Sequence, residues 1–197
     1  MNPEVGPASV GVEGVRKGSL LTRVARRAGP VGLGALVVAL AAQFSVPVPL
    51  SPVPMTLQPL AVLVAGGLLG PVGGVSALVL YIGLGALGLP VFAGGGFGAL
   101  HLIGPTGGYL LAFPVAAGVT GALVTRAPHS VLRILLACAL GMVIIHVGGV
   151  AQLALLGGDP RLAFRVGFLP FLTGDLLKVG LAALIILVAG SKIRSLL

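Results

Sequence analysis

Charged residues are scarce in this sequence, and their scarcity excludes an ordinary soluble domain. Only 8% of the 197 residues are Asp, Glu, Lys or Arg, and none of these lies between Arg27 and Arg126. Hydrophobic residues make up 57% of the chain, and its mean hydropathy is +1.16. Soluble domains carry about 25% charged residues. The composition therefore predicts an integral membrane protein.

Cysteine and the motifs of several enzyme classes are nearly or wholly absent. The single cysteine, Cys138, lies in an apolar stretch, which excludes an internal disulfide and a cysteine-based metal site. No Gly-Lys dipeptide occurs, and this excludes a phosphate-binding loop of the Walker A type. The chain also has no HExxH and no GxSxG motif. We therefore expect no catalytic residue, no metal and no cofactor, and any ATP-driven step requires a partner protein.

What the sequence does contain is a series of six apolar segments. They run over residues 30–46, 58–70, 71–89, 106–125, 131–156 and 169–189. A bilayer core of about 30 Å requires about 20 mostly apolar residues per helix, and the alternating polar residues of a membrane β-barrel are missing. The fold class that we predict is therefore an all-α integral membrane protein, a bundle of six transmembrane helices.

Proline and glycine mark the ends of these segments and indicate how they pack. The Pro-rich loop (residues 45–59) and the Gly-rich loop (residues 89–105) are rich in residues that end helices. The second and third segments are divided by the Gly-Pro step at 70–71 alone. Gly66 and Gly74 lie one turn to either side of Gly70, and such spacing allows another helix to approach closely in lipid.

The distribution of basic residues predicts the orientation of the bundle. Cytoplasmic loops of membrane proteins are enriched in Lys and Arg. With the N-terminus inside, nine basic residues fall on the cytoplasmic side, and only Arg161 and Arg165 fall outside. The nine are Arg16, Lys17, Arg23, Arg26, Arg27, Arg126, Arg133, Lys192 and Arg194. Both termini are then cytoplasmic, and both loops meet the start of the last helix on the outer face.

The first 27 residues carry five of these basic residues and show no apolar periodicity. We expect residues 1–27 to form a basic cytoplasmic leader, flexible or partly helical, and residues 28–197 to form the transmembrane domain. A signal peptide is the alternative, because residues 39–41 (Ala-Leu-Ala) imitate a cleavage site, but the leader is longer than a usual n-region. The net charge of +8 does not indicate a nucleic-acid partner, since the basic residues lie between apolar blocks.

Asp175 and Lys178 place two charges inside the last apolar segment. A charge at the bilayer centre costs about 2.5 kcal/mol or more, so it is a functional hypothesis by default. Residues three apart share a helix face. The pair is either a structural ion pair or a polar site for a small solute with N–H groups and a carboxylate. In the fifth segment, His146 has no carboxylate on its own helix, which favours a packing hydrogen bond over a proton relay.

Three motifs together resemble a known family. They are VPMTLQ at the end of the Pro-rich loop, GLPVFAGG followed by LIGPTGGYLLAF, and GDLLKV in the last segment. In this order on a six-span chain, they resemble the BioY family, the biotin-specific substrate-binding components of energy-coupling-factor (ECF) transporters. The resemblance covers about residues 30–190. It implies a six-helix bundle in the cytoplasmic membrane, with a ligand cavity near the outer face that is closed by the two loops.

The resemblance also implies roles for individual residues. Asp175 and Lys178 match the family's biotin-binding pair, and secondary lining residues are expected at Gln58, Phe92 and Tyr109. Beyond His101, the Gly-rich loop offers few polar side chains for the site. An AxxxA spacing on the first helix meets a transmembrane partner in such components, and Ala35 and Ala39 have that spacing.

The function implied by the resemblance is binding and uptake of biotin, without catalysis. The partners implied are a transmembrane coupling subunit and cytoplasmic ATPases, in addition to the lipid bilayer. Three alternatives stay open at this point. The chain is otherwise a binding component for another vitamin, a facilitator that works without partners, or, as the weakest rival, an intramembrane enzyme.

Overall fold

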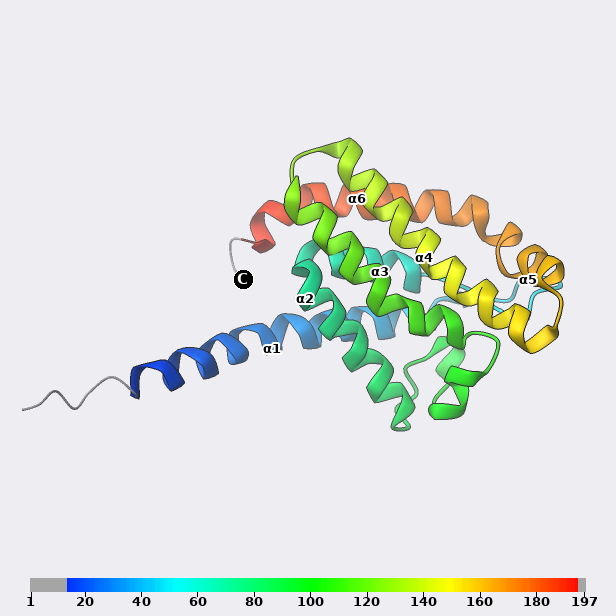
Figure 1. The fold of residues 1–197 in the computed structure, drawn as a ribbon, viewed down its shortest axis with the longest axis horizontal. Helices are drawn as coiled ribbons and strands as arrows, with labels where there is room; N and C mark the ends of the chain where they lie inside the picture. Colours follow the sequence, from blue (N-terminus) through cyan, green and yellow to red (C-terminus); the bar gives the residue numbers. More distant parts are fainter. Residues whose placement is uncertain (1–13, 195–197) are drawn as a thin grey trace, which may run out of the picture.

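The computed structural model describes residues 14–194, and helices make up most of this stretch (Figure 1). Residues 1–13, which belong to the predicted leader, lie outside the described residues. The elements in chain order, with η for a 3₁₀ helix, are α1 (Gly14–Gln43), β1 (Ser45–Val46), β2 (Met55–Thr56), α2 (Gln58–Ala86), η1 (Ala93–Gly95), η2 (Ala99–Ile103), α3 (Gly107–Arg126), α4 (Val131–Gly157), α5 (Pro160–Gly167), η3 (Leu169–Phe171) and α6 (Leu172–Arg194).

Four helical stretches of the described residues are long and apolar enough to cross a membrane. They are α2, α3, α4 and residues 160–190, which combine α5 with most of α6. The apolar part of α1, residues 28–43, is shorter. A mostly helical chain of the membrane type is therefore confirmed. The count of six spans and the cytoplasmic location of both termini stay predictions.

The predicted second and third segments form one element, α2, with a sharp break at Gly70. The backbone of Gly70 has φ 73° and ψ −178°, a conformation that is nearly exclusive to glycine, and Pro71 follows it. A Cβ atom on Gly74 would lie 2.9 Å from the Cα of Gly66. In a straight helix, residues eight apart are separated by about 12 Å. The chain therefore folds back at Gly70, and Figure 1 shows the two arms of α2.

Small residues allow α2 to approach α3 backbone to backbone. A Cβ atom on Gly66 would meet the carbonyl oxygen of Ala117, and one on Gly121 would lie 2.6 Å from the carbonyl oxygen of Gly66. Ala117 and Gly121 are one turn apart on α3. Helices in lipid associate through such close approach, because burial of apolar surface gives little drive there. The glycine spacing in the second segment thus serves packing inside the bundle.

We expect Gly66→Ala to destabilise the bundle. The added methyl group would meet the backbone of Ala117, which cannot move aside as a flexible side chain would, and overpacking of this kind costs about 1–3 kcal/mol. Gly83→Ala is the matched control, because it makes the same change in the same helix and its Cβ atom would meet nothing within 4 Å. Thermal unfolding in detergent should give a lower melting temperature for Gly66→Ala. Equal melting temperatures would contradict the close contact.

Ala35 and Ala39 lie on the side of α1 that packs on the bundle. Ala35 is 3% exposed and belongs to the main core, and Ala39 packs against that core. A Cβ atom on the neighbouring Gly34 would lie 3.1 Å from the Cβ of Ala77 in α2. The small size of these two alanines lets α1 approach α2, and their predicted role in binding a partner stays a prediction.

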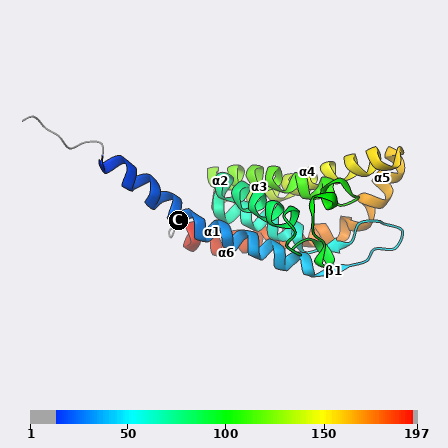
Figure 2. The ribbon, with the colours of Figure 1, turned by 90° about the horizontal axis from the view of Figure 1, so that it is seen from below.

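The predicted boundary between leader and transmembrane domain falls inside a helix. α1 begins at Gly14 and continues without interruption past residue 27 to Gln43. Its first half projects from the other helices in both views (Figures 1 and 2). The division into a leader and a transmembrane domain stays a prediction, and the side chains of residues 1–27 lie outside the described part of the chain.

The two loops and α5 gather at one end of the bundle. The start of α1, the end of α6 and the turn between α3 and α4 lie at the opposite end (Figure 1). β1 and β2 pair antiparallel, with Ser45 opposite Thr56, so the Pro-rich loop forms a closed hairpin. This topology brings together segments that are far apart in the sequence, as the outer-face prediction required.

Helix α5 was not predicted, because its stretch of sequence reads as a polar break. Its N-cap is Asp159, whose Oδ1 accepts hydrogen bonds from the backbone N–H groups of Arg161 at 2.8 Å and Leu162 at 3.2 Å. Pro160 occupies the first helical position, where a missing N–H costs nothing. The Asp-Pro pair is a helix-start signal that the sequence did contain.

Candidate binding site

A small cavity of about 50 Å³ lies at the loop end of the bundle. Its walls come from the Pro-rich loop and the start of α2 (Val53, Pro54, Thr56, Gln58, Pro59), from the Gly-rich loop and the N-cap of α3 (Ala93, His101, Thr106), and from α3, α4, η3 and α6 (Tyr109, Leu110, Phe113, Ile145, His146, Phe171, Asp175, Lys178). The structure thus brings Gln58, Tyr109, Asp175 and Lys178 of the predicted site residues to one cavity. Phe92 is not among its lining residues.

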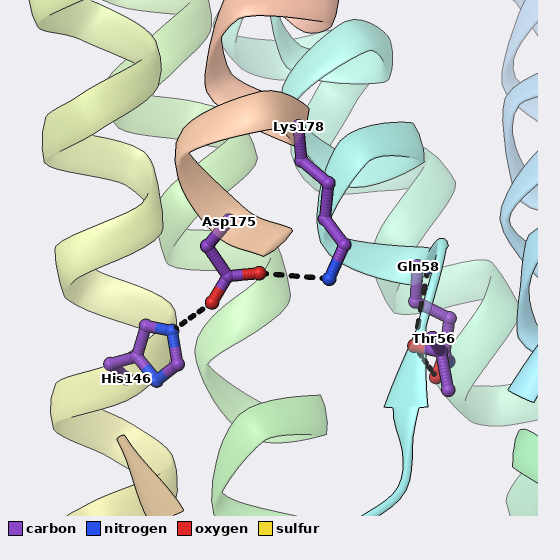
Figure 3. Close-up of polar contacts among 5 residues, drawn as sticks. All are labelled: Thr56, Gln58, His146, Asp175 and Lys178. Atoms are coloured by element: carbon purple, nitrogen blue, oxygen red, sulfur yellow. Dashed lines mark hydrogen bonds and ion pairs between the residues drawn. The ribbon is translucent and has the colours of Figure 1, made fainter. Parts of the chain in front are cut away.

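Asp175 and Lys178 form a buried ion pair on the cavity wall (Figure 3). The Nζ of Lys178 donates to Oδ1 of Asp175 at 2.8 Å, and the two residues are 6% and 5% exposed. Asp175 lies in the first turn of α6, directly after η3. The partial positive charge of a helix N-terminus favours a carboxylate there.

His146 of α4 is the third member of this polar cluster. Its Nε2 lies 2.6 Å from Oδ2 of Asp175. Since the carboxylate is ionised by its pairing with Lys178 and can only accept, Nε2 carries the proton and donates. The predicted hydrogen bond of His146 exists, and its partner is Asp175, which lines the cavity. No local pattern predicts this contact, because the two residues are 29 positions apart on different helices.

Gln58 presents an amide that is oriented by its neighbours. Its Oε1 accepts a hydrogen bond from the Thr56 hydroxyl at 3.1 Å, and its Nε2 donates to the Tyr81 hydroxyl at 2.6 Å. Tyr81 in turn donates to the carbonyl oxygen of Val91 at 3.1 Å. Figure 3 shows Thr56 and Gln58 on the side of the Lys178 ammonium away from Asp175. This chain of hydrogen bonds connects the end of the Pro-rich loop to the Gly-rich loop.

Tyr109 and Phe92, the two predicted aromatic lining residues, are placed differently. The ring of Tyr109 lines the cavity, while its hydroxyl donates to the carbonyl oxygen of Gly167 at 2.6 Å. Phe92 is fully buried, and its ring centroid lies 5.7 Å from that of Tyr81 and 5.1 Å from that of His101. Phe92 therefore supports His101, which lines the cavity, without reaching the cavity itself.

The Gly-rich loop is held in a defined conformation and is not a loose connector. Gln152 of α4 donates from Nε2 to the carbonyl oxygens of Leu102 at 3.1 Å and Gly104 at 2.6 Å. Three of its glycines have positive φ, which other residues adopt only with strain: Gly94, Gly95 and Gly98. The loop can therefore act as a fixed wall of the cavity.

The polar groups of the cavity offer donors and acceptors without net charge. The charges of Asp175 and Lys178 cancel. After the observed hydrogen bonds, the carboxylate keeps unused lone pairs and the ammonium keeps unused N–H donors. This suits a small uncharged group with N–H and C=O side by side. Within the described residues, no group of three or more His, Cys, Asp or Glu is placed to hold a metal ion.

A comparison with family models returns the family described as BioY, matched over residues 15–195. The chain belongs to the BioY family. The match covers every residue of the cavity wall and both loops. The family assignment that the three sequence motifs suggested is thus confirmed.

Similar proteins with curated names agree with this assignment. A probable biotin transporter BioY of Pyrococcus horikoshii is 41% identical over 162 residues, which cover 81% of this chain and 94% of that protein. The biotin transporter BioY of Thermotoga maritima is 44% identical over 140 residues, which cover 71% of this chain and 82% of that one.

A solved structure is also similar to this BioY-family chain. It is the S-component for biotin from an ECF-type ABC transporter, with a TM-score of 0.79 and 23% sequence identity. The likeness covers 88% of this chain and 93% of that one. At this level of identity, the likeness shows that the two chains share a fold.

Proposed function

We propose that this chain is the biotin-binding component of an ATP-driven ECF transporter in the cytoplasmic membrane. The observation that carries the proposal is the buried cluster of Asp175, Lys178 and His146 on the wall of a cavity that both loops close. The names of its BioY-family relatives support biotin as the ligand. In this function the chain captures its ligand and releases it unchanged, so it is not an enzyme.

The chemistry of biotin fits the polar cluster. The ureido ring of biotin carries N–H donors beside a carbonyl acceptor, and its valerate chain ends in a carboxylate. A carboxylate buried beside Asp175 would add an uncompensated negative charge to a neutral cluster in a low-dielectric place, which is costly. We therefore orient the ureido ring toward the cluster, with Asp175 accepting from N–H and Lys178 donating to C=O. The valerate carboxylate then points toward the loops, where His101 lines the wall.

The remaining predicted residues take supporting roles in this proposal. The ring of Tyr109 supplies an apolar wall, and the amide of Gln58 supplies an oriented polar group beside Lys178. Phe92 does not line the cavity, but its ring stacks on that of His101, which does, and so supports that side chain.

Binding requires part of the wall to move outward. The cavity measures about 50 Å³, whereas pockets for drug-sized ligands start at about 300 Å³. We expect the Pro-rich loop to move, because it covers the cavity with Val53 and Pro54. Its tip residue Leu50 is 95% exposed and has φ 64°, a strained value for a bulky side chain. The loop thus has few contacts at its tip to hold it closed.

We also propose six membrane crossings with both termini in the cytoplasm. The reversal at Gly70 supports counting the arms of α2 as two crossings beside α1, α3, α4 and α6. The end of the bundle that carries the start of α1 and the end of α6 also carries Arg126 and Lys192, and enrichment in basic residues favours that end inside. The cavity then opens to the outer face.

Partner proteins supply the energy in this proposal. The sequence has no Walker A loop, so a transmembrane coupling subunit and cytoplasmic ATPases are required. The docking surface that we propose is on α1 and includes Ala35 and Ala39, the pair with the AxxxA spacing. The same helix exposes large apolar side chains on its outer side, namely Leu33, Leu36, Val37 and Leu40.

Titration of the purified chain with labelled biotin tests the function. We expect saturable binding that unlabelled biotin displaces and other vitamins do not. Displacement by a different vitamin alone would support a binding component for that vitamin instead. Uptake into vesicles with and without the coupling subunit and ATPases is the second measurement. Equal uptake in both would favour a facilitator that works without partners.

A further inference from the structure

One nitrogen of the His146 ring is left without a partner inside the protein. Nε2 is bonded to Oδ2 of Asp175, whereas Nδ1 is buried and has no hydrogen-bond partner. Within the described residues, Nδ1 is the only buried side-chain nitrogen or oxygen atom that has no hydrogen-bond partner. Burying an unsatisfied polar group carries a free-energy cost. The imidazole is therefore held in an orientation in which Asp175 receives a hydrogen bond while Nδ1 of the ring has no partner.

Three aromatic rings fix this orientation. The centroids of Tyr109 and Phe168 lie 6.0 Å and 5.0 Å from that of His146, and both rings meet it nearly edge-on, at 84° and 88°. Phe171 lies 6.2 Å away at an angle of 47°. On its other side, His146 lines an apolar groove of about 490 Å³ between α4 and α5. The packed imidazole thus lies between Asp175 and that groove.

The contact with the Asp175 carboxylate places a proton on Nε2 of the ring. The charged groups near it are Asp175 and Lys178, both on α6, and they compensate each other. The hydroxyl of Tyr109 on α3 is bonded to the backbone of Gly167. The Nε2–H group is therefore committed to Asp175, and Nδ1 faces no partner.

We propose that His146 is a positioning residue for biotin recognition. Its Nε2–H holds Oδ2 of Asp175, so that Oδ1 stays on Lys178 and the free lone pairs of the carboxylate face the cavity. Without this donor, only Lys178 restrains the carboxylate, which is then free to rotate away from the ligand. The inference rests on the proposed function, because it concerns how Asp175 meets biotin.

A pair of substitutions separates the donor from the ring. His146→Phe keeps the aromatic packing and removes the N–H, whereas His146→Gln keeps an N–H donor near the position of Nε2. We expect His146→Phe to weaken biotin binding about 10- to 100-fold, the range for a lost hydrogen bond to a charged group, and His146→Gln to restore most of it. If His146→Phe does not fold, His146→Asn replaces it, because its shorter amide does not reach Oδ2.

A double-variant cycle with Asp175→Asn tests that the effect passes through the acid. In the Asp175→Asn background, His146→Phe should cost much less biotin affinity than it does alone, because coupled residues are not additive. Melting temperatures of the same four proteins report the contact without any ligand. Wild-type affinity for His146→Phe, no rescue by His146→Gln, or losses that simply multiply would each overturn the proposal.

Failure of the proposed function gives a different pattern. A wild-type chain that binds no biotin overturns both the function and the binding role of His146. Coupling that persists in the melting temperatures of that chain would then mark the His146–Asp175 contact as structural only.

Discussion

Asp175→Asn is expected to reduce biotin affinity by about 100-fold or more in a chain that still folds. Asp175 accepts hydrogen bonds at both oxygens, from Lys178 and from His146. Asparagine has nearly the same shape but only one acceptor, and it leaves the buried Lys178 without a counterion. The cluster then carries a net positive charge and loses its best acceptor for a ureido N–H. Equilibrium titration of the purified variant with labelled biotin measures the loss.

Asp159→Asn is the matched control for this change. Asp159 is exposed and caps α5, a position where asparagine serves as well as aspartate. Its biotin affinity and melting temperature should equal those of the wild type. Near wild-type affinity for Asp175→Asn would remove the acid from ligand recognition, and an equal loss in both variants would point to a general effect of lost negative charge.

Membrane helices were predictable where a long apolar run is bounded at both ends by helix-breaking residues. The segments expected at 106–125 and 131–156 are observed as α3 (Gly107–Arg126) and α4 (Val131–Gly157). α5 was missed because a helix of eight residues is too short to show an apolar period. Its cap was readable from Asp159 and Pro160, but a local signal of this kind is weak without the surrounding packing.

Small residues were the ambiguous part of the sequence. A spacing of four between small residues predicts that some helix approaches closely, but not which one. At Gly66 the approaching helix is α3 of the same chain, and at Ala35 it is α2. The partner-binding role expected of Ala35 and Ala39 stays a prediction for the same reason. Only tertiary structure separates a face that packs inside the bundle from one that docks a partner.

The part of the candidate site that lies on one helix, α6, was predictable from the sequence. Asp175 and Lys178 are three residues apart, so their pairing follows from helix geometry alone. The contact of Asp175 with His146 depends on how α4 lies against α6, which no spacing along the chain encodes. Phe92 illustrates the same limit, because its motif gave its neighbourhood but not whether its ring faces the cavity or the core behind it.

Lys178→Met is the second change with a large expected effect. It leaves the buried carboxylate of Asp175 with His146 as its remaining partner, and removing one member of a buried ion pair costs about 3–5 kcal/mol. The melting temperature should therefore fall, and biotin binding should be lost along with the ammonium that donates to the ureido oxygen. Arg165→Met, at an exposed position in α5, is the control and should change neither quantity.

Combining Lys178→Met with Asp175→Asn separates the binding role from a purely structural one. The double variant has no buried charge, and the asparagine oxygen still accepts from Nε2 of His146. Replacing both members of a buried ion pair by neutral groups is often nearly neutral for stability, so the melting temperature should recover relative to Lys178→Met. Biotin affinity should not recover, because the ligand has lost both its acceptor and its donor. A stable double variant that binds biotin as the wild type does would reduce the pair to a structural ion pair, the alternative that the sequence left open.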